Sequence, residues 1–123
     1  MKEYNWGPTF IVPSEILNKL SGIVRLREEF DEELLDKELG ALGIAGVIEK
    51  VTNPWYYRRK GTETWIKVGE SEDKADSFGV TWDTAKVPNG KYEVLGLMHV
   101  FVRKDGAHHA IARQNIVEVT VQN

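Results

Sequence analysis

The sequence contains no cysteine, and this absence excludes several kinds of site at once. A disulfide scaffold, a thiolate zinc site, an iron–sulfur cluster and a cysteine nucleophile all require that residue. A chain of 123 residues can bury a sufficient core without disulfides. The lack of cysteine therefore restricts the chemistry of the protein without arguing against a stable fold.

The chain also lacks a long hydrophobic run and a strong excess of charge. No stretch of roughly 18 apolar residues is present, so no transmembrane helix is expected. Met1 to Trp6 are mostly polar and do not form the apolar core of a signal peptide. Its 16 basic and 19 acidic residues give a net charge of -3, which disfavours a globally basic nucleic-acid binder. We therefore expect neither membrane insertion nor a nucleic-acid partner.

Alternating apolar and polar residues predict β-strands along most of the chain. Val24, Leu26, Glu28 and Phe30 share one face of a predicted strand, and residues 91–103 and 110–121 form a predicted hairpin around an Asp-Gly turn. Asn53-Pro54 indicates a turn, and residues 31–42 indicate a short helix or a long loop. The pattern predicts an all-β antiparallel sandwich of about seven strands, with this insertion after the second main strand. Residues 1–13 would form an N-terminal arm and first edge strand, and residues 14–123 the sandwich.

One stretch resembles a known family. Residues 78–94, FGVTWDTAKVPNGKYEV, resemble the F-x-V-x-W-D-T-x-x-V-P-N-G-x-Y-x-V stretch of bacterial immunoglobulin-like domains. Residues 20–26, the Asp-Gly turn and residues 115–121 resemble other strands and turns of the same domains. The resemblance implies an immunoglobulin-like β-sandwich of the kind found in surface proteins, exported polysaccharide-degrading enzymes and phage structural proteins.

The resembling residues have a structural interpretation. Pro88, Asn89 and Gly90 form a tight connection between strands, because proline fixes φ and glycine accepts a positive φ. Tyr92 follows this turn in the position of a tyrosine corner, whose hydroxyl bonds nearby backbone. Trp82 would fill core or sheet-edge space. These residues specify a fold and no chemistry.

No catalytic residue, cofactor or metal is expected. G-x-S-x-G, P-loop and H-E-x-x-H motifs are missing, and the glycines of residues 40–46 lack the order of a dinucleotide-binding loop. His99, His108 and His109 lie on the predicted hairpin and could meet around a metal, but neighbouring residues on a strand point to opposite faces. The acids of residues 28–38 suit either calcium or a solvated helix face, and we favour the helix face.

Residues 55–59 form the cluster with the clearest functional character. Exposed Trp, Tyr and Arg dominate protein interfaces, the same rings can stack on sugars, and Trp55 and Tyr57 could instead pack inside. The candidate interface residues are Trp6, Trp55, Tyr56, Tyr57, Arg58 and Arg59.

Together these observations predict a non-enzymatic structural or adhesive module that is a subunit of a larger assembly. We expect a phage virion decoration or tail protein, or a component of a cell-surface layer or appendage, located in the virion or at the cell surface. Its partners would be other protein subunits, as a homo-oligomer or as capsid or filament neighbours. The alternative is a carbohydrate-binding or linker module of an exported polysaccharide-degrading enzyme, with a glycan as the partner.

Overall fold

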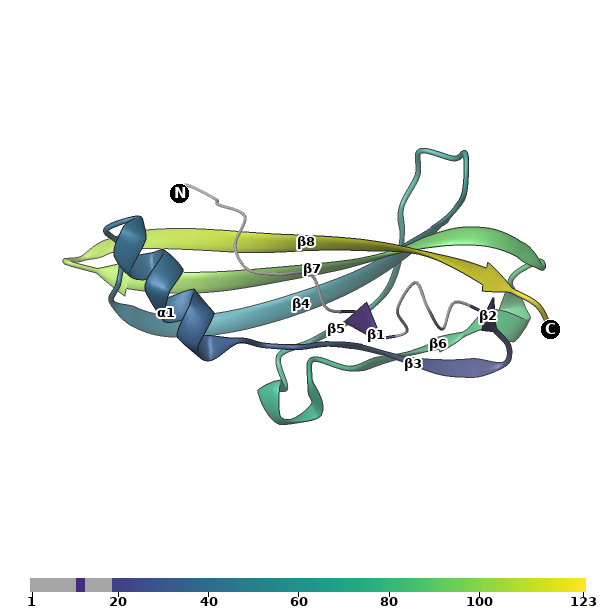
Figure 1. Ribbon diagram of the computed structural model, residues 1–123, viewed down its shortest axis with the longest axis horizontal. Coiled ribbons are helices and arrows are strands. Elements are labelled where there is room, and N and C mark those ends of the chain that lie inside the picture. Colours follow the sequence, from purple (N-terminus) through teal and green to yellow (C-terminus); the bar gives the residue numbers. More distant parts are fainter. Residues whose placement is uncertain (1–10, 13–18) are drawn as a thin grey trace.

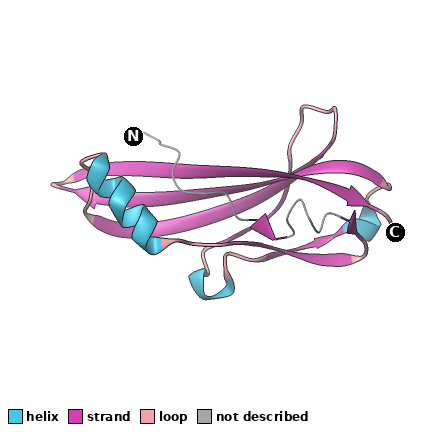
Figure 2. Ribbon diagram, viewed as in Figure 1, coloured by secondary structure: helices cyan, strands magenta, loops and turns pink. Residues whose placement is uncertain are grey.

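Long antiparallel strands dominate the computed structural model, which describes residues 11–12 and 19–123 (Figures 1 and 2). The larger sheet has the order β2-β8-β7-β4-β5, and the smaller sheet has the order β1-β3-β6. Neighbouring strands are antiparallel, except that β2 runs parallel to β8. The strands are β1 (Ile11–Val12), β2 (Lys19–Leu20), β3 (Ile23–Glu28), β4 (Val47–Arg59), β5 (Ile66–Ser71), β6 (Val80–Asp83), β7 (Gly90–Lys104) and β8 (Ala107–Val121).

The predicted fold class is confirmed. The described residues form eight strands, two of which have only two residues, and a single α-helix, α1 (Glu32–Ala41), follows β3. Asp105 and Gly106 both adopt positive φ between β7 and β8, as a tight hairpin turn requires. Two short 3-10 helices, η1 (Lys74–Asp76) and η2 (Thr84–Lys86), flank β6. The chain is therefore an all-β sandwich with one helical insertion.

The insertion is a helix and not a long loop. The Asp31 side chain accepts a hydrogen bond from the Leu34 backbone N–H at 3.0 Å, which caps the first turn. Leu35 and Leu39, one turn apart, are buried against Met98 and its neighbours on the large sheet. Figure 1 shows α1 lying across one half of this sheet, while β3 and β6 lie toward the other half. The helix therefore covers core that the short smaller sheet does not reach.

Two sequence predictions concern the N-terminal segment and the Asn53-Pro54 turn. β1 pairs with β3 at the edge of the smaller sheet, as predicted for a first edge strand, whereas residues 1–10 and 13–18, which include Trp6, lie outside the described residues. The predicted turn is wrong, because Asn53 and Pro54 lie inside the continuous strand β4. The register with β5 shifts directly after Trp55, and such irregularities accommodate a proline within a sheet.

The turn before β7 has the predicted structure. The Tyr92 hydroxyl donates a hydrogen bond to the Pro88 carbonyl oxygen at 2.6 Å, as a corner tyrosine does. Gly90 has a φ of 149°, a value that side chains disfavour. Trp82 is buried on the edge strand β6, where its ring stacks on Tyr57 with centroids 5.1 Å apart. These contacts fix the turn before β7 and the edge strand β6 against β4 at one end of the sandwich.

Candidate functional site

The five candidate interface residues on β4 divide between its two faces. Trp55 points into the core, where it has no exposed surface and its Nε1 donates to the Phe78 carbonyl oxygen at 2.9 Å. Trp55 is therefore a core residue, which corrects its assignment to an interface. The physical reason is its position opposite Gly96 on β7, where the missing side chain leaves room for the indole. The following residues of β4 alternate, so that Tyr57 and Arg59 lie on the inner face and Tyr56 and Arg58 on the outer face.

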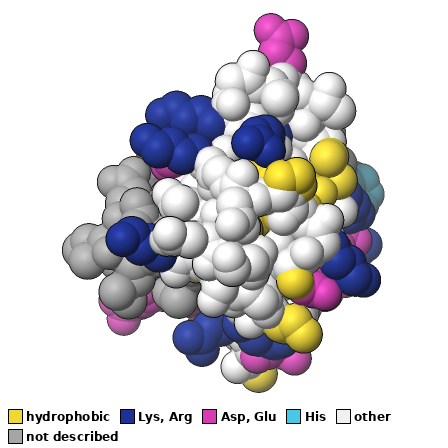
Figure 3. All heavy atoms as spheres, turned by 90° about the vertical axis from the view of Figure 1, so that its right-hand side faces the viewer, with side chains coloured by type: hydrophobic (Ala, Val, Ile, Leu, Met, Phe, Trp, Pro, Cys, Tyr) yellow, Lys and Arg dark blue, Asp and Glu magenta, His cyan; other side chains and the backbone are white. Residues whose placement is uncertain are grey.

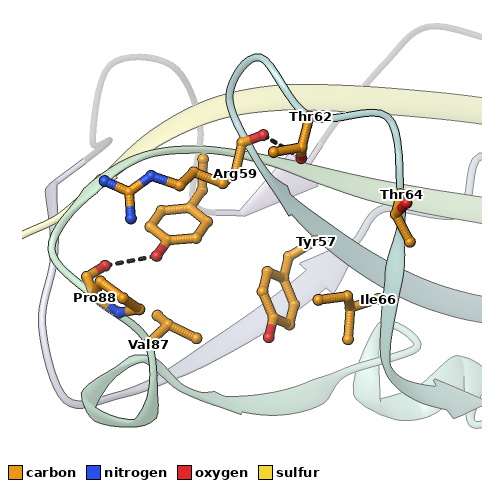
Figure 4. Close-up of a pocket in the computed structure, with 8 residues that line it drawn as sticks. Tyr57, Arg59, Thr62, Thr64, Ile66, Val87 and Pro88 are labelled. Atoms are coloured by element: carbon orange, nitrogen blue, oxygen red, sulfur yellow. Dashed lines mark hydrogen bonds between the residues drawn. The ribbon is translucent and has the colours of Figure 1, made fainter.

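Tyr57 and Arg59 line an open pocket of about 410 Å³ at the end of the sandwich (Figure 4). The pocket lies between the β4–β5 hairpin and the turn that leads into β7. Two stretches that the sequence singled out separately, residues 55–59 and residues 87–92, therefore meet here. The remaining lining residues are Thr62, Thr64, Ile66, Val87, Pro88 and Tyr92.

A second hollow of about 330 Å³ continues from the first and shares Tyr57, Ile66 and Val87 with it. Its other lining residues come from β5, β6 and η2, and they are Lys67, Val68, Thr81, Trp82, Asp83 and Lys86. Because the two hollows share a wall, we treat them as one surface feature, the β5–β6 groove.

The groove exists because two sheet edges separate. β5 ends the larger sheet and β6 ends the smaller sheet among the described residues. The edges come together at Gly69, where an added Cβ would lie 3.4 Å from Cγ1 of Val80. Toward Ile66, which is 49% exposed, the edges diverge and the hollow opens. The groove is thus bordered by the outermost strand of each sheet.

The rim of the groove is basic although the chain is acidic overall. Arg59, Lys67 and Lys86 are exposed along it, with Lys67 Nζ 3.7 Å from Oε1 of Glu70, and Asp83 is the one acid among the described lining residues. The Asp83 carboxylate accepts a hydrogen bond from the Ala85 N–H at 3.1 Å and so caps η2. Figure 3 views this end of the molecule and shows exposed hydrophobic side chains between Lys and Arg side chains. An acidic ligand would therefore meet a favourable local potential.

Tyr56 and Arg58 lie on the opposite, outer face of the larger sheet. Tyr56 pairs with Leu95 of β7, and Leu95 pairs with Ile116 of β8, which is 39% exposed. The outer face of an antiparallel sheet normally carries polar residues, but this one carries an apolar row, in which Leu95 is only 6% exposed between its neighbours. We name the outer sheet patch for its apolar members Tyr56, Leu95, Leu97, Phe101 and Ile116.

Arg58 is held at the border of the outer sheet patch. Its Nε donates to Oε1 of Glu93 at 3.0 Å, and its guanidinium lies 4.1 Å from the centroid of the Trp65 ring. Farther along the same border, Lys60 Nζ lies 2.8 Å from Oε2 of Glu118. The patch therefore has an apolar centre and a rim of both charges, which is the usual anatomy of a protein interface. Among the five members of this patch, the sequence singled out Tyr56 as an interface candidate but none of the other four.

A polar cluster is buried beneath Gly96. Glu28 of β3 has no exposed surface, and Asn115 of β8 donates a hydrogen bond to its Oε1. Burial raises the pKa of Glu28 to about 7, against the lowering effects of the Arg113 guanidinium and of the Asn115 and Asn53 amides. Burial also lowers the pKa of Arg113. The cluster joins the two sheets.

The described histidines and acids do not form a cluster that could bind a metal ion. Among the described residues, no three His, Asp or Glu side chains lie close enough to hold a metal ion. His108 instead lies 3.0 Å from the Glu49 carboxylate, and Glu32 at the start of α1 pairs with Lys74 at 2.8 Å. Asp31 caps α1, and Glu32, Glu33 and Asp36 lie on its exposed face. Glu28 is instead buried on β3, which corrects its assignment to a solvated helix face.

Comparisons with family models, with curated proteins and with solved structures give no match for this chain. Within the described residues, no helix is long and apolar enough to cross a membrane. Function is therefore inferred from the groove, the outer sheet patch and the fold that positions them.

Proposed function

We propose that this protein is a non-enzymatic, immunoglobulin-like structural module that assembles with copies of itself through the outer sheet patch. The assembly would be a virion component, such as a decoration or tail protein, or a cell-surface layer or appendage. The single observation that carries the proposal is the apolar row on the outer sheet face, in which Tyr56 and the exposed Ile116 flank the buried Leu95.

The fold supports the immunoglobulin-like part of the proposal. Immunoglobulin domains place a buried tryptophan on a central strand and a corner tyrosine at the start of a later one. Here Trp55 is buried on β4, and Tyr92 bonds the Pro88 backbone at the start of β7. Val94, two residues after Tyr92, belongs to the apolar core between the sheets, at the position where antibody domains carry the second cysteine of their disulfide.

The charges around the patch favour a second copy as its partner. A two-fold interface brings the same surface of each copy together, so the surface must complement itself. The rim offers both signs, with Arg58 beside Glu93 and Lys60 beside Glu118. Rotating one copy against the other can then set basic groups against acidic ones around an apolar centre.

Light scattering after size-exclusion chromatography, over a range of protein concentrations, tests this proposal. We expect the wild-type chain to form a dimer or larger oligomer and Ile116→Glu to be a monomer. Ile23→Glu is the matched control, because Ile23 is 71% exposed on β3 and lies outside the patch. A monomeric wild-type chain, or equal effects of the two substitutions, would contradict assembly through this face.

A carbohydrate-binding module is the second candidate, and the groove favours it in one respect. The rings of Tyr57 and Tyr92 line the pocket beside Thr64 and Arg59, which could hydrogen-bond a sugar. Affinity electrophoresis in gels that contain soluble polysaccharides tests this function. Retardation of the wild-type chain that Tyr57→Ala abolishes would support it, and unaltered mobility in every gel would count against it.

A further inference from the structure

We propose that the β5–β6 groove binds an extended, acidic segment of a partner polypeptide, which adds as a strand along β5 and places alternate apolar side chains in the pocket. This inference goes beyond the proposed assembly, because the groove and the outer sheet patch lie on different faces of the larger sheet.

The edge of β5 is unpaired among the described residues. β5 pairs with β4 on one side, and no described strand pairs with its other side. An edge strand presents backbone N–H and C=O groups that a further strand can bond. β6 is likewise the last described strand of the smaller sheet, so an inserted segment would meet an open edge on each wall.

An apolar pocket lies beside that edge. In strand addition, backbone hydrogen bonds supply affinity and pockets for alternate side chains supply specificity. Ile66, Val87 and Pro88 line the pocket next to the start of β5. Its volume of about 410 Å³ falls within the usual range of ligand pockets. A bulky apolar side chain would cover Ile66, which is otherwise exposed.

The hydroxyl groups of the pocket favour a peptide over a sugar. A sugar needs several free hydrogen-bonding groups that converge in the site. The Thr62 hydroxyl already donates to the Arg59 carbonyl oxygen at 2.6 Å, and the Tyr92 hydroxyl donates to Pro88 (Figure 4). Two of the four hydroxyl protons in the described lining are therefore committed to the backbone, which leaves fewer groups for a sugar beside the apolar Ile66, Val87 and Pro88.

The charge of the groove favours an acidic segment. The exposed cations Arg59, Lys67 and Lys86 follow the groove; Lys67 is paired with Glu70 at 3.7 Å, and the acid among the described lining residues, Asp83, caps η2. The local excess of positive charge contrasts with a net charge of -3 for the whole chain. Asp and Glu side chains between the apolar residues of the incoming strand would be attracted to this rim.

Selection from a displayed library of random peptides, about 12 residues long, against the full chain tests the inference. A strand of that length spans β5 with its flanks. We expect selected peptides to alternate apolar with acidic residues, to bind more weakly as salt rises, and to slow hydrogen exchange of the β5 amides. Selection of no such peptide, or of peptides that leave β5 exchange unchanged, would overturn the proposal.

Substitutions then assign the binding to the groove. We expect Lys67→Glu with Lys86→Glu to weaken the selected peptides by at least about tenfold, since two exposed favourable charges become repulsive. Val87→Glu should also weaken binding by placing an acid in the pocket. Ile23→Glu is the control and should bind normally.

Self-association through the outer sheet patch and peptide binding in the β5–β6 groove can be contradicted independently of each other. Ile116→Glu should abolish self-association but retain peptide binding. The groove variants, Lys67→Glu with Lys86→Glu and Val87→Glu, should lose peptide binding but still self-associate. Equal peptide affinity in wild-type and groove variants would overturn the strand-addition site. Retention on polysaccharide gels together with no peptide selection would assign the groove to glycans instead and would likewise overturn it.

Discussion

Arg113 Nε lies 3.3 Å from Oε1 of Glu28, and this buried pair joins β8 of the larger sheet to β3 of the smaller one. A buried ion pair need not stabilise a fold, because removing both charges from water costs several kcal/mol per ion and can exceed their mutual attraction. Here burial dominates, since it raises the pKa of Glu28 to about 7 in spite of the guanidinium beside it. The link between the sheets should therefore depend on pH.

The first prediction is that stability falls as pH rises from about 4.5 to about 7. A glutamate in the unfolded chain has a pKa near 4.5, whereas the folded Glu28 has a pKa of about 7, so the folded state binds more protons between these values. The free energy of unfolding must then decrease with pH across that window. At about 1.4 kcal/mol per pKa unit, the total change is a few kcal/mol. Urea unfolding at several pH values measures it.

Glu28→Gln is the control for this titration, because an amide keeps the shape and cannot ionise. The other charged groups near the pair are Glu29 and Asp31, which act to raise the pKa of Arg113 against the lowering effect of burial. A slope that is the same in wild type and Glu28→Gln would show that Glu28 does not titrate in this range.

The second prediction concerns the tight packing of Gly96 against Glu28 and Trp55. A Cβ at Gly96 would lie 2.9 Å from Oε2 of Glu28 and 3.1 Å from Cζ3 of Trp55. Neither buried side chain can move freely, so we expect Gly96→Ala to destabilise the fold by about 1–3 kcal/mol. Thermal unfolding monitored by circular dichroism would detect this change.

Gly40→Ala provides the matched control for Gly96→Ala. Gly40 lies in α1, and a Cβ there would meet nothing within 4 Å. Alanine is favoured over glycine inside a helix by about 0.5–1 kcal/mol, so this variant should be at least as stable as wild type. Equal melting temperatures of the two variants would contradict the tight packing at Gly96.

The sequence predicts strands well where one face alone is apolar. The alternation of Val24, Leu26 and Glu28 correctly placed all three on one face of β3, including the buried acid. The inward residues of β4 could not be predicted this way, because Trp55 to Arg59 are all large and the residues themselves do not show which ones point inward. That information comes from the register with Gly96 on another strand.

The two candidate surfaces depend on contacts between distant parts of the chain. The β5–β6 groove requires that Ile66 at the start of β5 and Val87 after η2 line the same hollow, and no local pattern encodes this. The outer sheet patch did leave a signal, since Leu95 and Leu97 make β7 apolar on both faces. A strand of that kind in an antiparallel sheet indicates a covered outer face.

The third prediction tests the corner tyrosine. Tyr92→Phe removes the hydroxyl that donates to Pro88 at 2.6 Å and leaves a backbone carbonyl oxygen without this partner. We expect a loss of about 1 kcal/mol in the free energy of unfolding, or slightly more. Tyr56→Phe on the outer face is the control and should change stability little. An unaltered urea midpoint in Tyr92→Phe would remove the corner assignment.

The fourth prediction concerns Trp55, whose position in the core replaces an expected interface. Trp55→Ala deletes a fully buried indole and its hydrogen bond to the Phe78 carbonyl oxygen, so we expect a loss of about 3–5 kcal/mol. That is a large part of the total stability of a typical domain, and partial unfolding at room temperature should follow.

Trp65→Ala is the control for Trp55→Ala, because Trp65 is only half-buried and lies against Arg58 on the outer face. It should cost much less stability, on the order of 1 kcal/mol, because little packed core is lost. Near-ultraviolet circular dichroism and urea unfolding of both variants distinguish the two roles. If Trp55→Ala unfolded at the same urea concentration as Trp65→Ala, Trp55 could not be the residue that fills the space beside Gly96.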